Sequence, residues 1–127
     1  MTAPRTIPGQ RCNIGPDEIA RRRRFAIVAS VATVALALGL LEAGVPPIAR
    51  AIVWPVAAAA AVTWLQVVRR FCVRFGALGV ENFGPLGTET EVDRRVRAAD
   101  ARRALEMVLE GVLLGLLATV ALVQLPA

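Results

Sequence analysis

Three long stretches of this sequence contain no charged residue, and they constrain the fold more than any other feature. Residues 25–41 form an uncharged run of 17, residues 51–68 a run of 18, and residues 111–125 a run of 15. A bilayer core about 30 Å thick is crossed by about 20 helical residues, so each run supplies most of a transmembrane helix. The sequence therefore predicts an all-α integral membrane protein with three transmembrane helices.

The composition excludes several other classes of protein. Of the 127 residues, 56% are hydrophobic and 20% are charged, whereas soluble domains average about 45–50% apolar and about 25% charged residues. Because the apolar excess is concentrated in three runs, a disordered chain, a secreted disulfide scaffold and an ordinary soluble enzyme are all excluded.

Proline, glycine and charged residues set the expected boundaries. Pro16 suits a first helical turn and the acids after it favour the positive end of a helix dipole, so a helix containing the first span is expected at residues 16–41. Gly44 and the prolines after it predict a turn, flanked by Glu42 and Arg50, which are expected to pair or to remain in water. We expect one membrane domain over residues 1–127, divided into a cytoplasmic tail (1–15), the first helix (16–41), a second span (48–68), a cytoplasmic loop and polar helix (71–103) and a third span (105–125).

The segment between the second and third spans carries too many charges to lie in lipid. Thr88 and Glu91 have the spacing of a capping box, which predicts an amphipathic, polar cytoplasmic helix over about residues 89–103 that leads into the third span. The apolar side chains of residues 71–85, by contrast, are expected to rest in the headgroup layer.

The arginines predict the orientation. All 15 basic residues are arginine; 14 of them precede the first span or lie between the second and third, and only Arg50 falls on the opposite side. Cytoplasmic loops carry the excess of basic residues in membrane proteins. The sequence therefore predicts a multi-pass protein of the cytoplasmic (inner) membrane of a bacterium, with the N-terminus in the cytoplasm and the C-terminus outside.

Several of these arginines adjoin the predicted spans, where each can add about 1 kcal/mol of attraction to anionic lipid. The expected lipid-contact residues are Arg21, Arg22, Arg23, Arg24, Arg69 and Arg70. Because topology explains the basic charge, we expect a bilayer with anionic headgroups as the partner and no nucleic acid.

Small residues at four-residue spacing allow helix backbones to approach closely in lipid. The third span contains Gly111 and Gly115 followed by Ala118, and the first span contains Ala35 and Gly39. This pattern fits either packing within the chain or a homo-oligomer interface.

Cys12 and Cys72 are the only cysteines, and the chain has no histidine. These are too few ligands for a closed zinc site, so neither a metal nor a cofactor is expected. Both cysteines fall on the cytoplasmic side of the predicted topology, which permits a thiol or sulfur-handling site. The alternative is that each is a small hydrophobic residue.

Glu110 is the acidic residue placed deepest in a predicted span. An ionisable group at such depth is costly unless it is paired or hydrated, and it often marks a transport pathway. Glu110 is thus either a site for protons or cations, or a structural partner of an arginine such as Arg69 or Arg70.

Two short motifs flank the first two spans. The first comprises Asn13-Ile14-Gly15, Glu18 and Arg22, and the second comprises Cys72, Phe75, Leu78, Gly79 and Val80. At this spacing they resemble the Asn-x-Gly-x-x-Asp-Arg-x-x-Arg opening and the Cys-Pro-Leu-Tyr and Leu-Gly-Ile motifs of the YgaP-like transmembrane domain, over about residues 12–82. Glu18, Ile19 and Val73 depart from that pattern, and the third span is additional.

This resemblance implies a small inner-membrane helical hairpin that can dimerise. Some members of the family are fused to a rhodanese sulfurtransferase domain, which we do not expect here. Separately, Asn82-Phe83-Gly84-Pro85 echoes Asn13-Ile14-Gly15-Pro16, and each precedes a helix expected to enter the membrane from the cytoplasm.

The leading hypothesis is a small, non-enzymatic membrane protein that acts as an oligomer or as an accessory or scaffold subunit of a larger membrane complex. Its arginine-rich cytoplasmic face would contact anionic lipid or a partner. The alternatives are a thiol or sulfur-handling protein that uses Cys72, and an oligomeric transporter or pore that uses Glu110. Catalysis is not expected, because the sequence shows no nucleophile–base pair or metal-ligand cluster.

Overall fold

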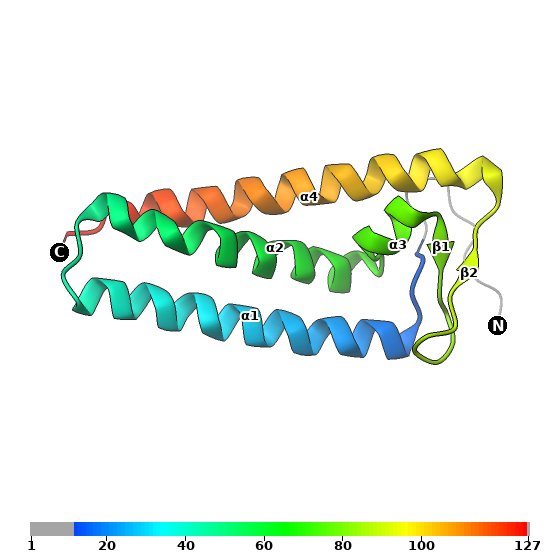
Figure 1. Ribbon diagram of the computed structural model, residues 1–127, viewed down its shortest axis with the longest axis horizontal. Helices are drawn as coiled ribbons and strands as arrows, with labels where there is room; N and C mark the ends of the chain where they lie inside the picture. The colour runs from blue at the N-terminus through cyan, green and yellow to red at the C-terminus, as the bar shows by residue number, and fades with distance from the viewer. Residues whose placement is uncertain (1–11, 127) are drawn as a thin grey trace.

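The computed structural model describes residues 12–126, in which three long helices lie side by side (Figure 1). Helix α1 spans Pro16–Glu42, the 3-10 helix η1 (Pro47–Ile52) leads directly into α2 (Val53–Arg69), and α4 spans Arg94–Val123. By length and composition, three helical segments could each cross a membrane: Pro16–Glu42, Pro47–Arg69 and Arg94–Val123. The prediction of a mostly helical chain with three helices of membrane-spanning length is confirmed.

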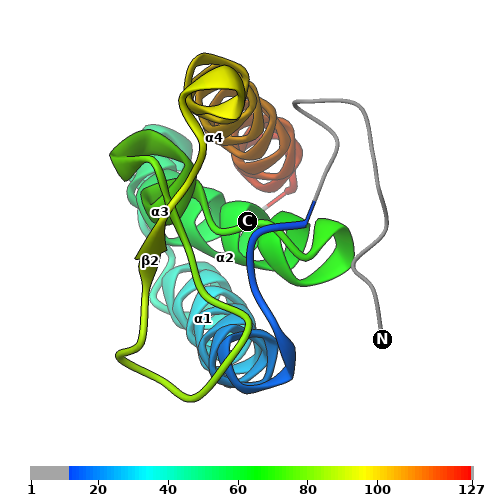
Figure 2. The same ribbon diagram turned by 90° about the vertical axis from the view of Figure 1, so that its right-hand side faces the viewer.

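Helix α2 is the middle helix of the bundle. It packs against both α1 and α4, and the end-on view shows α1 and α4 on different sides of it (Figure 2). Helix α1 therefore buries only three residues, all in its first three turns: Glu18, Arg22 and Ala26. Along the rest of α1, large apolar side chains such as Val31 and Leu38 are exposed, which is typical of a helix that faces lipid or another protein.

Close contact between α2 and α4 depends on two glycines. A Cβ at Gly115 would lie 2.7 Å from the backbone nitrogen of Ala58, and one at Gly111 would collide with the side chain of Val62. Since dispersion contacts, rather than water exclusion, hold helices together in lipid, this close approach contributes directly to packing.

The other small residues of the predicted packing face lie outside this contact. Ala118 and Ala35 are exposed, and a Cβ built at Gly39 would meet no atom within 4 Å. Among the described residues, the small-residue pattern of the first span is therefore exposed rather than packed against another helix.

Two tryptophans of α2 connect the three helices. The indole N–H of Trp64 donates to Ser30 Oγ of α1 at 2.8 Å, and that of Trp54 donates to the carbonyl of Val112 in α4 at 3.1 Å. Each indole N–H group thus donates to an atom of a neighbouring helix.

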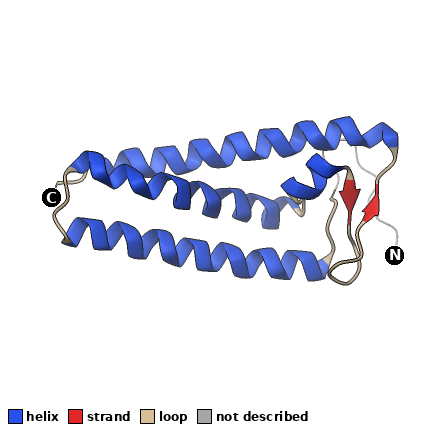
Figure 3. Cartoon of the chain, viewed as in Figure 1, coloured by secondary structure: helices blue, strands red, loops and turns tan. Residues whose placement is uncertain are grey.

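At one end of the bundle, residues 71–93 fold back over the helices (Figure 3). They form the short helix α3 (Val73–Leu78) and two antiparallel strands, β1 (Val80–Glu81) and β2 (Thr90–Glu91), paired Val80 to Glu91 and Glu81 to Thr90. We call residues 12–15 together with residues 71–93 the cap.

The predicted start of the last helix was wrong. Helix α4 begins at Arg94, with Asp93 as its N-cap accepting from the Arg95 amide at 3.4 Å, and Glu91 lies in β2. The hydroxyl of Thr88 donates to the Asn82 side-chain oxygen at 2.9 Å and to the Pro85 carbonyl at 2.6 Å. Thr88 is thus part of the loop, so it caps no helix. From Arg94 onward the polar and apolar parts form one continuous helix.

At the end opposite the cap, Arg50 is fully buried. Its Nη1 donates to the carbonyls of Leu122 at 3.0 Å and Leu125 at 2.7 Å. The last carbonyls of a helix lack intrahelical partners, so Arg50 closes the end of α4. The expectation that Arg50 would pair with Glu42 or remain in water was wrong for this reason.

Candidate functional site

The cap begins where the N-terminal segment meets the chain after α3. The Asn82 amide donates to the Asn13 carbonyl at 2.9 Å, and the Gly15 amide donates to the Asn82 carbonyl at 2.8 Å. These bonds form a parallel bridge between Ile14 and Asn82. The two Asn-x-Gly-Pro segments, which echo each other in sequence, therefore lie against each other in space.

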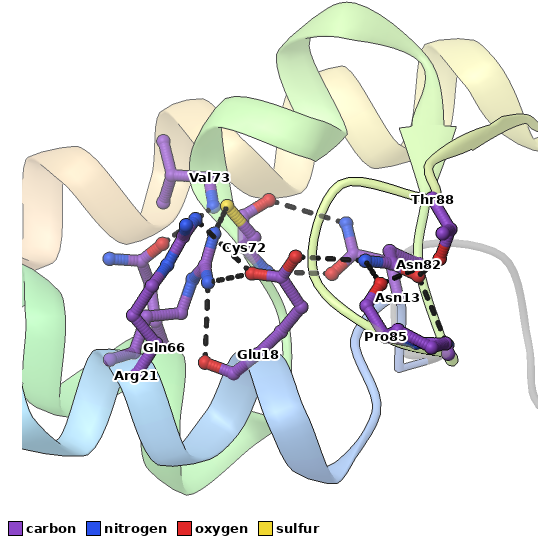
Figure 4. A network of polar contacts seen from close by, with 11 residues as sticks. Asn13, Glu18, Arg21, Gln66, Cys72, Val73, Asn82, Pro85 and Thr88 are labelled. Carbon is purple, nitrogen blue, oxygen red and sulfur yellow. Dashed lines mark hydrogen bonds and ion pairs between the residues drawn. The ribbon is translucent and has the colours of Figure 1, made fainter.

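The two asparagine side chains are buried and hydrogen-bonded (Figure 4). Asn13 binds both backbone groups of Cys72: its Oδ1 accepts from the Cys72 amide at 2.6 Å, and its Nδ2 donates to the Cys72 carbonyl at 3.2 Å. Asn82 Nδ2 donates to Glu18 Oε2 at 2.8 Å and to the Pro85 carbonyl at 2.9 Å. Asparagine suits this role because one side chain both donates and accepts.

Glu18 and Arg22 form a buried ion pair one turn apart on α1. Glu18 is 1% exposed and Arg22 is 7% exposed, and the Arg22 guanidinium donates to Glu18 Oε1. Arg21 approaches the same oxygen at 3.3 Å. A buried carboxylate is tolerated when its lone pairs are satisfied in this way. Arg22 is therefore unavailable to lipid, which corrects the prediction for this one arginine of the run.

Arg22 also reaches Cys72 and Phe75. Its Nη2 donates to the Cys72 sulfur at 2.8 Å, and its guanidinium lies 5.2 Å from the centroid of the Phe75 ring. Cys72 is 2% exposed and packs with Ile14 and Phe75 in one apolar cluster. Cys12 is half-buried, and the two cysteines are present as thiols rather than as a disulfide.

Two of the three phenylalanines of the cap face inward. Phe71 and Phe75 are 0% and 1% exposed, and the Arg103 guanidinium lies 5.0 Å from the Phe71 ring centroid. The expectation that the apolar side chains of residues 71–85 rest in the headgroup layer was therefore wrong for these two rings. Phe71 packs against Ala104 and Met107 of α4, and Phe75 packs with Ile14 and Cys72. Leu78 and Phe83 are exposed.

Glu110 is paired with Arg69. The two side chains form a bidentate ion pair between α4 and α2, with N–O distances of 2.7 and 2.8 Å. Bidentate arginine–carboxylate pairs are among the stronger polar contacts because both hydrogen bonds are charge-assisted. This geometry fits the second role predicted for Glu110, that of a structural partner of an arginine.

A groove of about 800 Å³ lies between the start of α1 and the end of α2. Its lining includes Ile19, Ala20, Val67 and Val68, together with Arg23 and Arg70. Arg70 ends α2 in the left-handed conformation, with φ of 53°. Sequence reasoning placed both arginines next to lipid but could not show that they share a groove, because α1 and α2 meet only in the folded chain.

The exposed arginines of residues 12–126 gather at the cap end of the molecule, around the first turns of α1, the end of α2 and α3, and the start of α4 (Figure 1). They are Arg23, Arg24, Arg70, Arg74, Arg94, Arg95, Arg97 and Arg102. The predicted tail with Arg5 and Arg11 lies mostly outside the described residues. Within residues 12–126, no group of three or more His, Cys, Asp or Glu side chains is placed to hold a metal ion.

No family model, curated protein or solved structure matches this chain. The resemblance to the YgaP-like transmembrane domain therefore stays a prediction from two short motifs. Four residues of those motifs, Asn13, Glu18, Arg22 and Cys72, lie within one network between α1 and the cap. The polar groups of this network bind one another and are buried, so its role is structural: it connects α1 to the cap.

Proposed function

We propose that this chain is a non-enzymatic integral protein of the bacterial cytoplasmic membrane, acting as an oligomer or as an accessory subunit of a larger complex. Its arginine-rich cap end would contact anionic lipid or a partner. The observation that carries this proposal is the position of the exposed arginines. In the described residues they all lie at the cap end, whereas the arginine at the other end, Arg50, is buried.

The same distribution supports the proposed orientation. Basic residues accumulate on the cytoplasmic side of a bacterial membrane, so the cap end would lie in the cytoplasm and the end near Leu125 outside. Three crossings fit this arrangement, because the two ends of the described chain lie at opposite ends of the bundle (Figure 1).

The outward face of α1 supports association with another protein. Helix α1 packs mainly against α2, and its exposed surface combines large apolar side chains with the small residues Ala35 and Gly39. Small residues let a second helix approach closely in lipid.

The structure favours neither of the alternative functions. Glu110 is neutralised by Arg69, which accounts for its charge without a transported ion. Cys72 is enclosed by the cap, so its thiol lacks the exposure typical of reactive cysteines.

Purified protein in a mild detergent would test this proposal by two readings: the mass of the protein by light scattering, and the thermal unfolding midpoint with added phosphatidylglycerol or phosphatidylcholine. We expect a mass above one chain and a larger rise in midpoint with phosphatidylglycerol, which weakens as salt screens the charges. A variant combining Arg24→Gln, Arg74→Gln and Arg102→Gln should lose most of this difference.

The control is Arg95→Gln, because Arg95 is also exposed but lies in the first turn of α4, at the far end of the helix from its apolar part. It should leave the lipid response unchanged. A lone monomer that gains nothing from phosphatidylglycerol would contradict the proposal.

A further inference from the structure

The groove between α1 and α2 combines apolar walls with two basic side chains. Ile19, Ala20 and Arg23 contribute from α1, Val67, Val68 and Arg70 contribute from the end of α2, and residues 12 and 14–16 with Phe83 line the side next to the cap. Its volume of about 800 Å³ falls within the range of about 300–1,000 Å³ that is usual for small-molecule sites. Among the described residues, no Asp or Glu lines it.

Unlike Arg21, Arg22 and Arg69, the two arginines of this groove have no acidic partner among the described residues. Arg21 and Arg22 contact Glu18, and Arg69 contacts Glu110. Within residues 12–126, no carboxylate pairs with Arg23 or Arg70. The groove therefore presents positive charge that the described part of the chain leaves uncompensated.

The groove also lies at the level where the apolar helices end. Arg23 precedes the uncharged residues 25–41, and Arg70 follows the uncharged residues 51–68. With the chain inserted as proposed, both guanidiniums would lie at the depth of the lipid phosphates, and Val67 and Val68 would lie just inside the acyl region.

We infer that this groove binds one anionic phospholipid, with its phosphate between Arg23 and Arg70, one acyl chain against Val67 and Val68, and its headgroup on the cap side, beside Ile19 and Ala20. Guanidinium groups bind phosphate oxygens in bidentate fashion, and the apolar side chains of Val67 and Val68 match an acyl chain. A zwitterionic lipid would place the positive group of its headgroup beside the two arginines, so an anionic headgroup is favoured. This inference rests on the proposed function, because it requires the cap end to lie at the headgroups.

Native mass spectrometry of the full chain, released from detergent with phosphatidylglycerol or phosphatidylcholine of identical acyl chains, tests the inference. We expect one retained phosphatidylglycerol per chain. Each arginine near an anionic lipid is worth about a fivefold change in affinity, so Arg23→Gln combined with Arg70→Gln should weaken retention about 25-fold. Equal retention of the two lipids, or no retention of either, would overturn the inference.

A second variant separates the groove from general surface charge. Ala20→Trp fills the groove while both arginines remain, and it should abolish retention of the single lipid. Its control is Ala32→Trp, because Ala32 is also exposed on α1 but is not among the lining residues. Retention that survives Ala20→Trp contradicts a site in the groove.

The remaining outcomes identify other occupants. If Arg24→Gln weakens retention as much as Arg23→Gln, the attraction belongs to the arginine-rich end as a whole, so the groove inference fails while the proposed function stands. If inorganic phosphate at millimolar concentration displaces the lipid completely, the site recognises a free anion and the lipid assignment is overturned. An unchanged unfolding midpoint for each variant shows that the fold is intact.

Discussion

Glu18 and Arg22 are buried side by side, and each charge depends on the other for a hydrogen bond. Glu18 also accepts from Asn82, and Arg22 also donates to the Cys72 sulfur. Bringing two charges out of water is costly, and the pair is maintained only while both members are present. Removing one member leaves an uncompensated charge buried between α1 and the cap. The stability of the cap should therefore be sensitive to single substitutions that keep the shape of the side chain.

Glu18→Gln tests this dependence. The substitution keeps the size of the side chain but leaves the Arg22 guanidinium buried without an anion, so we expect unfolding to become easier by about 3 kcal/mol. Detergent-purified protein titrated with a denaturing detergent gives the measurement. Asp17→Asn is the control, since Asp17 is exposed on the preceding residue and its loss should change little. Equal stability of Glu18→Gln and the parent would show that the buried pair contributes nothing.

Sequence reasoning at this scale succeeded where a partner is local and failed where it is distant. Glu18 and Arg22 are four residues apart, a spacing that permits pairing on any helix. Asn13 and Cys72, however, are 59 residues apart. No local pattern encodes that contact, and none distinguishes the buried Arg22 from the exposed Arg23 beside it.

Among the helices, the contact between α2 and α4 has the least room for change. A Cβ at Gly115 would lie 2.7 Å from the Ala58 amide nitrogen, so Gly115→Ala forces the helices apart and should destabilise the protein by about 1–3 kcal/mol. Gly39→Ala is the matched control. A Cβ there meets nothing within 4 Å, and alanine favours the helix by about 1 kcal/mol. Thermal unfolding in detergent should therefore separate the two variants in opposite directions, and the same shift in both would contradict the packing.

The ion pair between α2 and α4 should have a smaller effect. Arg69 and Glu110 are 33% and 46% exposed at their side chains, and such partly exposed pairs are worth about 0–1 kcal/mol. We expect Glu110→Gln and Arg69→Gln each to lower stability by less than about 1 kcal/mol, and the double variant to cost no more than the larger single effect. A double-mutant cycle measures this coupling. Additive losses would show that the two side chains act independently.

As with the residues, the elements that depend on local sequence were predictable and those that depend on distant contacts were not. The long helices follow from uncharged runs, because length and composition alone determine whether a helix can span lipid. Helix α3 and strands β1 and β2 follow from contacts between distant segments, so residues 71–93 were expected to form only a loop and the beginning of a polar helix. Thr88 is an example: its hydroxyl binds Asn82 and Pro85, so it does not act as the N-cap of a helix.

For the whole molecule, the two cysteines provide a test of orientation. Cys12 is half-buried and Cys72 is enclosed, and both lie at the cap end. With the cap in the cytoplasm, a membrane-impermeant maleimide should label Cys12 in inverted vesicles but not in intact cells. Cys12→Ala should remove this labelling, because Cys72 becomes reactive only after unfolding.

An outer marker completes the orientation test. Glu42→Cys, in a background without Cys12, introduces a thiol at an exposed position of the opposite end and should be labelled in intact cells. Labelling of Cys12 in intact cells would mean that the orientation is inverted, and the proposed contact of the cap with cytoplasmic lipid would then fail.

The bridge between Ile14 and Asn82 has a consequence for how the protein is made. Ile14 precedes α1 and Asn82 follows α3, so with the chain inserted as proposed the bridge could close only after α1 and α2 had both crossed the membrane. A chain that inserted α1 in reverse would leave Asn13 and Asn82 on opposite faces, and the buried Glu18, Arg22 and Cys72 would then lack their partners. With that topology, closure of the cap would select for correct insertion during biogenesis, because only correctly threaded chains would become stable.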